Sequence, residues 1–219
     1  QHTHWLIYPL FVLACAKQTA PTGGPKDTIP PVLISSRPFN QQTNYNASSL
    51  ELTFNERLLL NNPKEQIIIT PNVGNKFEAE AKKNTVTIKF DSPFDPNTTY
   101  SINFRDAVQD ITEKNPVENL KLAFSTGDYI DSLMIQGLVY DLLKSTETKD
   151  ATIALFQSDT FNIFKHKPIY FTKSDTKGKF QLTNLKPGNY YIYAFDDKNK
   201  NLIVESKSES YGYLVKTIQ

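Results

Sequence analysis

The chain has 219 residues, which gives room for about two domains, since single domains usually hold roughly 100 to 150 residues. Its 24 basic and 23 acidic residues leave a formal net charge of +1, so no general electrostatic field attracts nucleic acid or an anionic membrane surface. A single cysteine excludes an internal disulfide framework. Stability must therefore come from packing, and we expect two small cores rather than a large one.

An uncharged apolar run of ten residues, WLIYPLFVLA, stands near the N-terminus. A membrane-spanning helix needs about 20 such residues, so the run is too short to be one. Its last residues and the cysteine that follows fit the lipobox of bacterial lipoproteins: Val12, Leu13, Ala14 and Cys15. We therefore predict a signal peptide over residues 1–14 and lipid attachment at Cys15, whose acyl chains anchor the protein in a membrane. The alternative is a buried strand or helix start with a structural cysteine, but the N-terminal position favours the lipoprotein.

The segment after the cysteine, AKQTAPTGGPKDTIPP, contains four prolines and two glycines and almost no large apolar side chain. Such a segment cannot bury enough surface to offset its ordering entropy, so we expect a flexible tether over residues 15–28. The chain begins with Gln1, and QHTH lacks the basic residues that open a signal peptide. We therefore expect the start of the gene to be missing, and residues 214–219 to begin a continuation that is cut short.

From Val32 onward, apolar residues alternate with polar ones, which is the pattern of half-buried strands. Clear examples are LELTF at 50–54, VTIKF at 86–90 and YSINF at 100–104. The same alternation is found at 134–140, 153–156, 180–182 and 190–195. No segment shows a useful helical stripe, and residues 106–118 are best interpreted as a loop with at most one helical turn. The ordered part is predicted to be all-β, with two consecutive antiparallel sandwiches.

Residues 27–126 resemble the bacterial Ig-like domain of the S-layer-protein type. The matching segments are DTIPPV at 27–32, LELTFNE at 50–56, DPNTTY at 95–100, the loop at 106–115 and FSTG at 124–127. Their order and spacing cover a whole domain, so the resemblance implies an Ig-like sandwich over residues 29–128. The sequence NERLLL at 55–60 departs from the family pattern, which has a proline-containing turn there, and this departure concerns the shape of one loop.

Residues 130–213 are similar to the transthyretin-like or carboxypeptidase-regulatory-like sandwich, a repeating module of surface proteins. The matching segments are QGLVYD at 136–141, ATIALF at 151–156, TKSDTKGKFQLTNL at 172–185 and PGNYYIYAFD at 187–196. The resemblance implies a second sandwich over residues 129–213, with a hairpin turn at Asp175 and Gly178 and a tight turn at Gly188. A lipobox, a tether and this pair of modules together resemble outer-membrane lipoproteins of Gram-negative bacteria.

The sequence offers little for catalysis or metal binding. Outside the signal region His166 is the only histidine. A serine or cysteine nucleophile therefore lacks a recognisable histidine base, and too few histidine and cysteine side chains are available to bind zinc. Asp197, Asn199 and Asn201 place oxygen atoms at alternate positions, as calcium loops do. Position six of that pattern is Leu202 rather than glycine, and position twelve is a serine rather than glutamate. A polar hairpin tip is the favoured interpretation, with calcium binding left open, and we predict no cofactor and no metal.

A group of carboxylates and a group of tyrosines could each form a functional site, but both have an ordinary structural explanation. Glu56, Asp106 and Asp110 could supply the paired carboxylates of a glycoside hydrolase, but the resembled domain uses these positions structurally. An aromatic stripe could stack on sugars, but alternation along a strand divides its members between two faces: Tyr190, Tyr191 and Tyr193.

The sequence therefore predicts a non-enzymatic envelope lipoprotein of the outer membrane, with its periplasmic or surface orientation left open. Its two modules are expected to act as scaffold or interaction domains for other envelope proteins, without a nucleic-acid partner. The alternative is an adhesin or carbohydrate-binding surface protein in which these modules form the stalk. Fold resemblance cannot choose between the two, because function resides in sites carried by such sandwiches.

Overall fold

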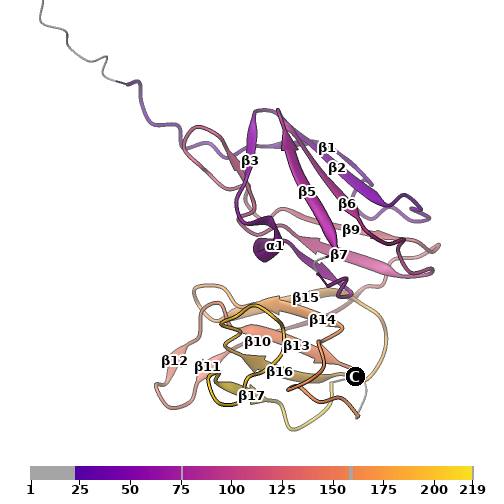
Figure 1. Ribbon diagram of the computed structural model, residues 1–219, viewed down its shortest axis with the longest axis vertical. Helices are drawn as coiled ribbons and strands as arrows, with labels where there is room; N and C mark the ends of the chain where they lie inside the picture. Colours follow the sequence, from indigo (N-terminus) through magenta and orange to yellow (C-terminus); the bar gives the residue numbers. More distant parts are fainter. Residues whose placement is uncertain (1–22, 75, 158–159, 219) are drawn as a thin grey trace, which may run out of the picture.

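The computed structural model describes residues 23–74, 76–157 and 160–218, and these form two β-rich units stacked end to end (Figure 1). Seventeen strands and one four-residue helix are defined in the described residues, which confirms the all-β prediction. In the same part of the chain, no helix is long and apolar enough to cross a membrane.

The N-terminal unit is a sandwich of two antiparallel sheets. The first sheet has the order β1-β2-β6-β5 and consists of β1 (Leu33–Arg37), β2 (Ser49–Phe54), β6 (Thr85–Phe90) and β5 (Phe77–Lys82). The second has the order β4-β7-β9 and consists of β4 (Ile68–Thr70), β7 (Thr99–Asn103) and β9 (Lys121–Ser125). A smaller pair is formed by β3 (Leu58–Leu60) and β8 (Val108–Asp110), and helix α1 (Pro63–Gln66) connects β3 to β4.

The core of this unit comes from the apolar positions of the predicted alternation. Leu50, Leu52 and Phe54 of β2 are at most 1% exposed, while the intervening Glu51 is exposed. They pack with alternate residues of the facing strands, including Phe124 of β9, in one hydrophobic cluster. The period-two pattern in the sequence is thus the period with which side chains enter the core.

The C-terminal unit is built on a four-stranded antiparallel sheet of order β14-β13-β16-β17. Its strands are β14 (Tyr170–Lys173), β13 (Thr152–Phe156), β16 (Tyr191–Phe195) and β17 (Tyr211–Tyr213). A second antiparallel pair joins β10 (Leu133–Leu138) to β15 (Lys179–Leu185), and a short hairpin consists of β11 (Tyr140–Asp141) and β12 (Thr146–Glu147). The four-stranded sheet carries a separate apolar cluster on each face.

The tyrosines near β16 divide between these two clusters, as the alternation predicts. Tyr190 is buried in the cluster that contains Ile153 and Leu155. Tyr191 and Tyr193 pack instead with the cluster on the opposite face. Gly178 in the β14–β15 turn has a φ of +69°, whereas Gly188, in the bend that precedes β16, does not have a positive φ.

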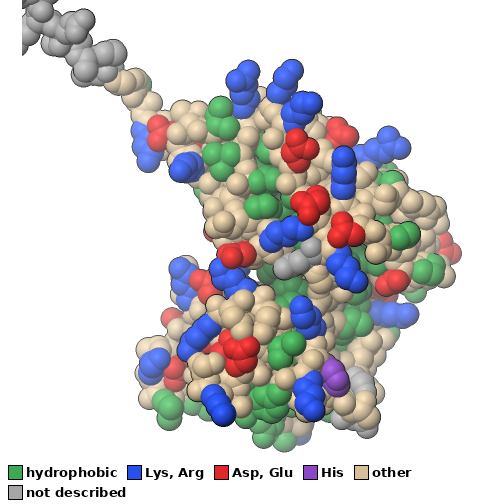
Figure 2. Space-filling model, viewed as in Figure 1, with side chains coloured by type: hydrophobic (Ala, Val, Ile, Leu, Met, Phe, Trp, Pro, Cys, Tyr) green, Lys and Arg blue, Asp and Glu red, His purple; other side chains and the backbone are tan. Residues whose placement is uncertain are grey.

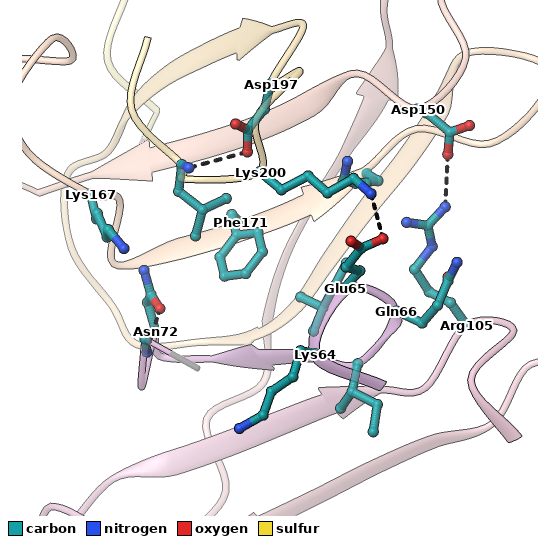
Figure 3. A pocket seen from close by; sticks show the side chains of 15 residues that line it. Lys64, Glu65, Gln66, Asn72, Arg105, Asp150, Lys167, Phe171, Asp197 and Lys200 are labelled. Atoms are coloured by element: carbon teal, nitrogen blue, oxygen red, sulfur yellow. Dashed lines mark hydrogen bonds and ion pairs between the residues drawn. The ribbon is translucent and has the colours of Figure 1, made fainter. Parts of the chain in front are cut away.

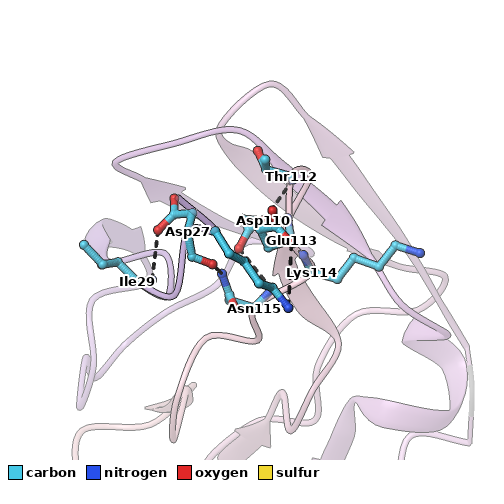
Figure 4. Close-up of polar contacts among 8 residues, drawn as sticks. Asp27, Ile29, Asp110, Thr112, Glu113, Lys114 and Asn115 are labelled. Carbon is cyan, nitrogen blue, oxygen red and sulfur yellow. Dashed lines mark hydrogen bonds and ion pairs between the residues drawn. The ribbon is translucent and has the colours of Figure 1, made fainter. Parts of the chain in front are cut away.

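The segment at 106–118 is better ordered than the predicted loop, because it contains strand β8 and a turn organised by the buried Asp110 (Figure 4). The carboxylate of Asp110 accepts four backbone N–H groups at 2.7 to 3.1 Å, from Thr112, Glu113, Lys114 and Asn115. Burial alone would raise the pKa of Asp110, but these hydrogen bonds stabilise the carboxylate and place its pKa below the ordinary range. The Asn115 side chain in turn donates to the carbonyl of Asp27, which ties the segment before β1 to the sandwich.

The two units pack directly on each other. Strands β4 and β7 of the N-terminal unit lie against β14 and β15 of the C-terminal unit. At the edge of this contact, the backbone N–H of Asn72 donates to the carbonyl of Ile169 (2.7 Å), and its side chain donates to the carbonyl of Pro168 (3.1 Å). The backbone N–H of Asp131 donates to the Thr99 hydroxyl (2.9 Å) where the chain passes from one unit to the other.

Ion pairs add to this interface. The Arg105 guanidinium lies 2.8 Å from the Asp150 carboxylate, and the Lys200 ammonium pairs with Glu65 of α1. Both pairs join groups that are far apart in the sequence and lie on opposite sides of the junction. These ion pairs fix which edges of the two units meet. Each pair is partly exposed and contributes about 0.2 to 1 kcal/mol to stability.

Replacement of Asp110 by asparagine is expected to lower the free energy of unfolding near neutral pH by about 1 to 3 kcal/mol, because hydrogen bonds to a charged acceptor are lost. The folded-state pKa of Asp110 is lowered, so its contribution is present above the unfolded-state pKa of about 3.9 and is lost as the pH falls through the lower folded-state pKa. Chemical denaturation as a function of pH measures this. Wild type and Asp110→Asn should converge at low pH, and the exposed Asp106→Asn is the control; equal curves for all three proteins would contradict the role assigned to Asp110.

Charge reversal at the junction is expected to weaken the contact between the units. Arg105→Glu places two carboxylates together and should lower the melting temperature at low ionic strength, and Asp150→Arg added to it should restore much of the loss. Scanning calorimetry at low and high salt gives the comparison. Lys144→Glu is the control, because it reverses one member of the exposed Lys144–Asp141 pair within the C-terminal unit. Absence of rescue by the second charge would show that the pair does not couple the units.

Candidate functional site

A cleft of about 300 Å³ lies at the junction, open to solvent between the two units (Figures 2 and 3). The N-terminal unit contributes α1 and the residues around β4, together with Arg105, and the C-terminal unit contributes β14 and the loops at 150 and 196–202. The polar side chains that line it are Lys64, Glu65, Gln66, Asn72, Arg105, Asp150, Lys167, Lys173, Asp197 and Lys200. A wider hollow that shares Gln66, Arg105, Asp150 and Lys173 adjoins the cleft.

Local sequence explains how the N-terminal wall is placed. The sequence NNP at 61–63 begins α1: Asn62 adopts a left-handed conformation with a φ of 43°, and Pro63 takes the first helical position. This single turn directs Glu65 and Gln66 toward the second unit (Figure 3). The amide oxygen of Gln66 is buried and has no hydrogen-bond partner among the described residues.

The opposite wall is formed by β14 and the loop after β16. Phe171 and Lys173 are two residues apart on β14, so both side chains emerge on the same face, toward the cleft. Asp197 is buried at the start of the loop, and its carboxylate accepts the backbone N–H groups of Asn201 and Leu202. Burial raises the pKa of Asp197, and those hydrogen bonds together with the nearby Lys173 only partly oppose this rise.

Positive charge predominates around the cleft, which is lined by five cationic and three acidic side chains. Two of the acids are engaged in ion pairs, Glu65 with Lys200 and Asp150 with Arg105. Among the described residues, Lys167 and Lys173 have no carboxylate within ion-pair distance. The pKa of Lys173 lies below its ordinary value, first because of burial and next because the positive charge of Arg105 is close.

The cleft is lined by groups that can bind a ligand. The described residues that line it include no histidine, cysteine, serine or threonine, so this lining does not contain a hydroxyl or thiol nucleophile beside an imidazole base. Ammonium, guanidinium and amide groups converge there from both units instead. Such groups recognise anionic and hydroxyl-bearing molecules.

The residues of the predicted lipid-attachment site lie outside the described residues: Val12, Leu13, Ala14 and Cys15. Lipid attachment at Cys15 therefore stays a prediction.

The possible calcium loop is held by its own backbone. The carboxylate of Asp197 and the side-chain oxygen of Asn199 both accept the N–H of Asn201. The side-chain oxygen of Asn201 accepts the N–H of Ile203 at 2.7 Å. In the part of the chain that the structure describes, no three His, Cys, Asp or Glu side chains form a metal-binding group. Asp197 lines the cleft, a position that its sequence context did not indicate.

The other candidate groups do not line the cleft. His166 is exposed, and its Nδ1 atom accepts the backbone N–H of Asn162 at 3.0 Å. The oxygens of Asp110 are occupied by the N–H groups of its turn, and Asp106 is exposed. Burial and the negative charges of Asp110 and Asp27 raise the pKa of Glu56. Asp110 is thus committed to structure and does not serve as one of the paired carboxylates.

The cleft itself was missed by sequence reasoning. Its residues come from stretches at 64–74, 105, 150–173 and 197–202, and no motif connects them. One signal was available in the three consecutive isoleucines of QIIIT at 66–70, where a strand with one solvent-exposed face would alternate apolar and polar residues. Such a run predicts a strand covered on both sides, and therefore a second layer against this sheet.

Comparison with solved structures gives weak global likeness. An L,D-transpeptidase from Mycobacterium smegmatis is 12% identical with a TM-score of 0.32, over 75% of this chain and 76% of the other. The N-terminal part of the bacterial S-layer protein SbsC is 14% identical with a TM-score of 0.30, over 76% of this chain and 40% of the other. The major pilin subunit of Bacillus cereus in one crystal structure is 16% identical with a TM-score of 0.25, over 82% and 61%. This chain thus covers less than two thirds of the length of the S-layer and pilin chains.

A search of curated proteins gave no match to this chain. Residues 27–126 match the family model of the bacterial Ig-like domain, the same residues over which the sequence resembles that family. This match covers the sandwich of the N-terminal unit. The N-terminal unit is therefore similar to the bacterial Ig-like domain over these residues.

Proposed function

We propose that this protein is a lipid-anchored, non-enzymatic scaffold of the bacterial envelope, in which an Ig-like domain and a transthyretin-like module present a joint surface to another envelope protein. The observation that carries the proposal is the junction, where main-chain hydrogen bonds and ion pairs link the two units. Because the two units are linked, the surfaces at their far ends keep a fixed distance and orientation. That is the property required of a scaffold or a spacer.

The anchor in this proposal is Cys15, followed by the tether at 15–28. The described part of the tether, residues 23–28, is exposed, as expected of a spacer between a membrane and a folded domain. Each acyl methylene buried in a bilayer contributes about 0.8 kcal/mol to membrane binding. Several acyl chains on one cysteine therefore anchor a protein stably, whereas a single chain gives only weak, reversible binding. We place the protein in the outer membrane, on the resemblance of its lipobox and modules to outer-membrane lipoproteins.

The surface offered to a partner is the free edge of the C-terminal sheet. Strand β17 is the last strand in the order β14-β13-β16-β17, and all its residues are exposed. The chain that follows it leaves Val215 88% exposed and Leu214 53% exposed. An exposed edge strand with apolar side chains can accept an additional strand from another protein.

A second candidate function is an adhesin or carbohydrate-binding surface protein in which the two modules are the stalk. The polar cleft at the junction favours it, because convergent amide and cationic groups beside an aromatic ring are suited to sugar hydroxyls and acids. The cleft and the β17 edge are separate surfaces, so the two functions can be tested separately.

Loss of the lipobox cysteine is expected to abolish anchoring. In a Gram-negative host, Cys15→Ser should remove labelling by radioactive palmitate and release the protein from the membrane fraction, because serine cannot form the thioether. Ala16→Ser is the matched control, which keeps the cysteine and should label normally. Labelling that persists in Cys15→Ser would overturn the anchor.

A partner should be captured through the β17 edge. Chemical crosslinking of the tagged, membrane-bound chain is expected to give a defined heteromeric product, which Val215→Asp reduces by placing a charge on the apolar edge. Ser208→Asp, which adds the same charge at another exposed position, should leave the yield unchanged. Recovery of monomer alone, or equal yields from the two variants, would contradict an interaction at this edge.

A further inference from the structure

Cationic side chains outnumber acidic ones in the cleft at the junction, and the carboxylates of Asp197 and Asp150 offset the charge of Lys173 only in part. Lys173 is half-buried on β14, and Lys167 lies at the rim beside Asn72 (Figure 3). In the described part of the chain, neither ammonium group has a carboxylate within ion-pair distance. Arg105 and Lys200 add two further cations to the lining, although each also pairs with an acid. A partly buried cation beside other cations is stabilised when an anion enters.

The same wall carries an apolar ring surface. Phe171 lines the cleft beside Lys167 and Lys200 (Figure 3), and it shares the face of β14 with Lys173. An aromatic ring next to a cation matches a ligand that has both a flat apolar face and a negative group. The C–H face of a pyranose ring and a carboxylate or phosphate substituent have this arrangement.

The opposite wall provides a hydrogen-bond acceptor. The Gln66 side-chain oxygen is buried without a partner among the described residues, and Gln66 lines both the cleft and the adjoining hollow. A buried acceptor without a donor is unfavourable, and a ligand hydroxyl can supply that donor. The volume of about 300 Å³ is at the small end of ligand pockets, which suits a single sugar unit.

We propose that the cleft between the two units binds an acidic sugar unit, a hexuronate or a hexose phosphate, with Lys173 contacting the anionic group, Phe171 packing on the ring and Lys167 adding positive charge at the rim. Gln66 accepts a hydrogen bond from a ring hydroxyl. The site goes beyond the scaffold function, since it uses neither the lipid anchor nor the β17 edge. It requires both units, because Gln66 and the three residues of the opposite wall belong to different domains.

Isothermal titration of the full chain with glucuronate, glucose 6-phosphate, glucose and inorganic phosphate tests the proposal. Both acidic sugars are expected to bind, with glucose at least about tenfold weaker because it lacks the charge, and phosphate at least about tenfold weaker because it lacks the ring. Lys173→Met should weaken glucuronate binding by about tenfold, and Lys167→Met should weaken it less, because Lys167 acts from the rim. Methionine keeps the length and apolar stem of lysine, so the fold is retained.

Lys89→Met is the matched control, because Lys89 is exposed on β6 and lies outside the cleft lining. It removes the same charge and should leave the affinity unchanged, and Cys15→Ser should do so as well. The melting temperature of each variant, measured by circular dichroism, reports whether it stays folded. The proposal is overturned if neither acidic sugar binds, if inorganic phosphate binds as tightly as the sugars, or if Lys173→Met and Lys89→Met have the same affinity.

Discussion

The burial of both faces of β4 is the constraint from which the arrangement of this molecule follows. Ile67 and Ile69 enter the core of the Ig-like sandwich, and the intervening Ile68 is also only 4% exposed, beside Phe171 and Leu182 of the second unit. An isolated sandwich would leave Ile68 in water, and burying such a side chain is worth about 1.5 to 3 kcal/mol. The second unit is therefore a structural layer on the first, and the cleft is the part of this contact that the side chains do not fill.

The polar groups at the junction set its geometry more than its strength. Interfaces between domains of one chain are usually polar, and partly exposed ion pairs such as Arg105–Asp150 add little stability each. The hydrogen bonds of Asn72 act differently, because they join the backbone of one unit to the carbonyls of Pro168 and Ile169 in the other and so fix register. Burial of apolar side chains at β4 and β14 holds the two units together, and the hydrogen-bonding and charged groups at the rim determine which edges meet.

Sequence reasoning predicted the first domain well because its signals are local. Alternation in LELTF follows directly from the two-residue period of a strand, and the family match covers residues 27–126, where the resemblance had been placed. The order in 106–118 was underestimated, because a buried carboxylate that caps four N–H groups cannot be distinguished by residue type from an exposed one. The cleft could not be predicted, because it depends on how two sandwiches dock and their interface residues follow no periodicity of their own. Only the three consecutive isoleucines of QIIIT pointed to a second layer.

The charges at the cleft indicate why its residues are there at all. A junction selected for stability alone would place apolar or paired side chains around Lys173, since an unpaired, partly buried cation costs free energy and burial already lowers its pKa. The β14 strand instead presents Phe171 and Lys173 on the face turned to the cleft, opposite an amide whose oxygen has no partner among the described residues. Departures from good packing that gather in one concave place are the usual mark of a binding function. The fold supplies two generic sandwiches, and the specific chemistry of the described chain is concentrated where they meet.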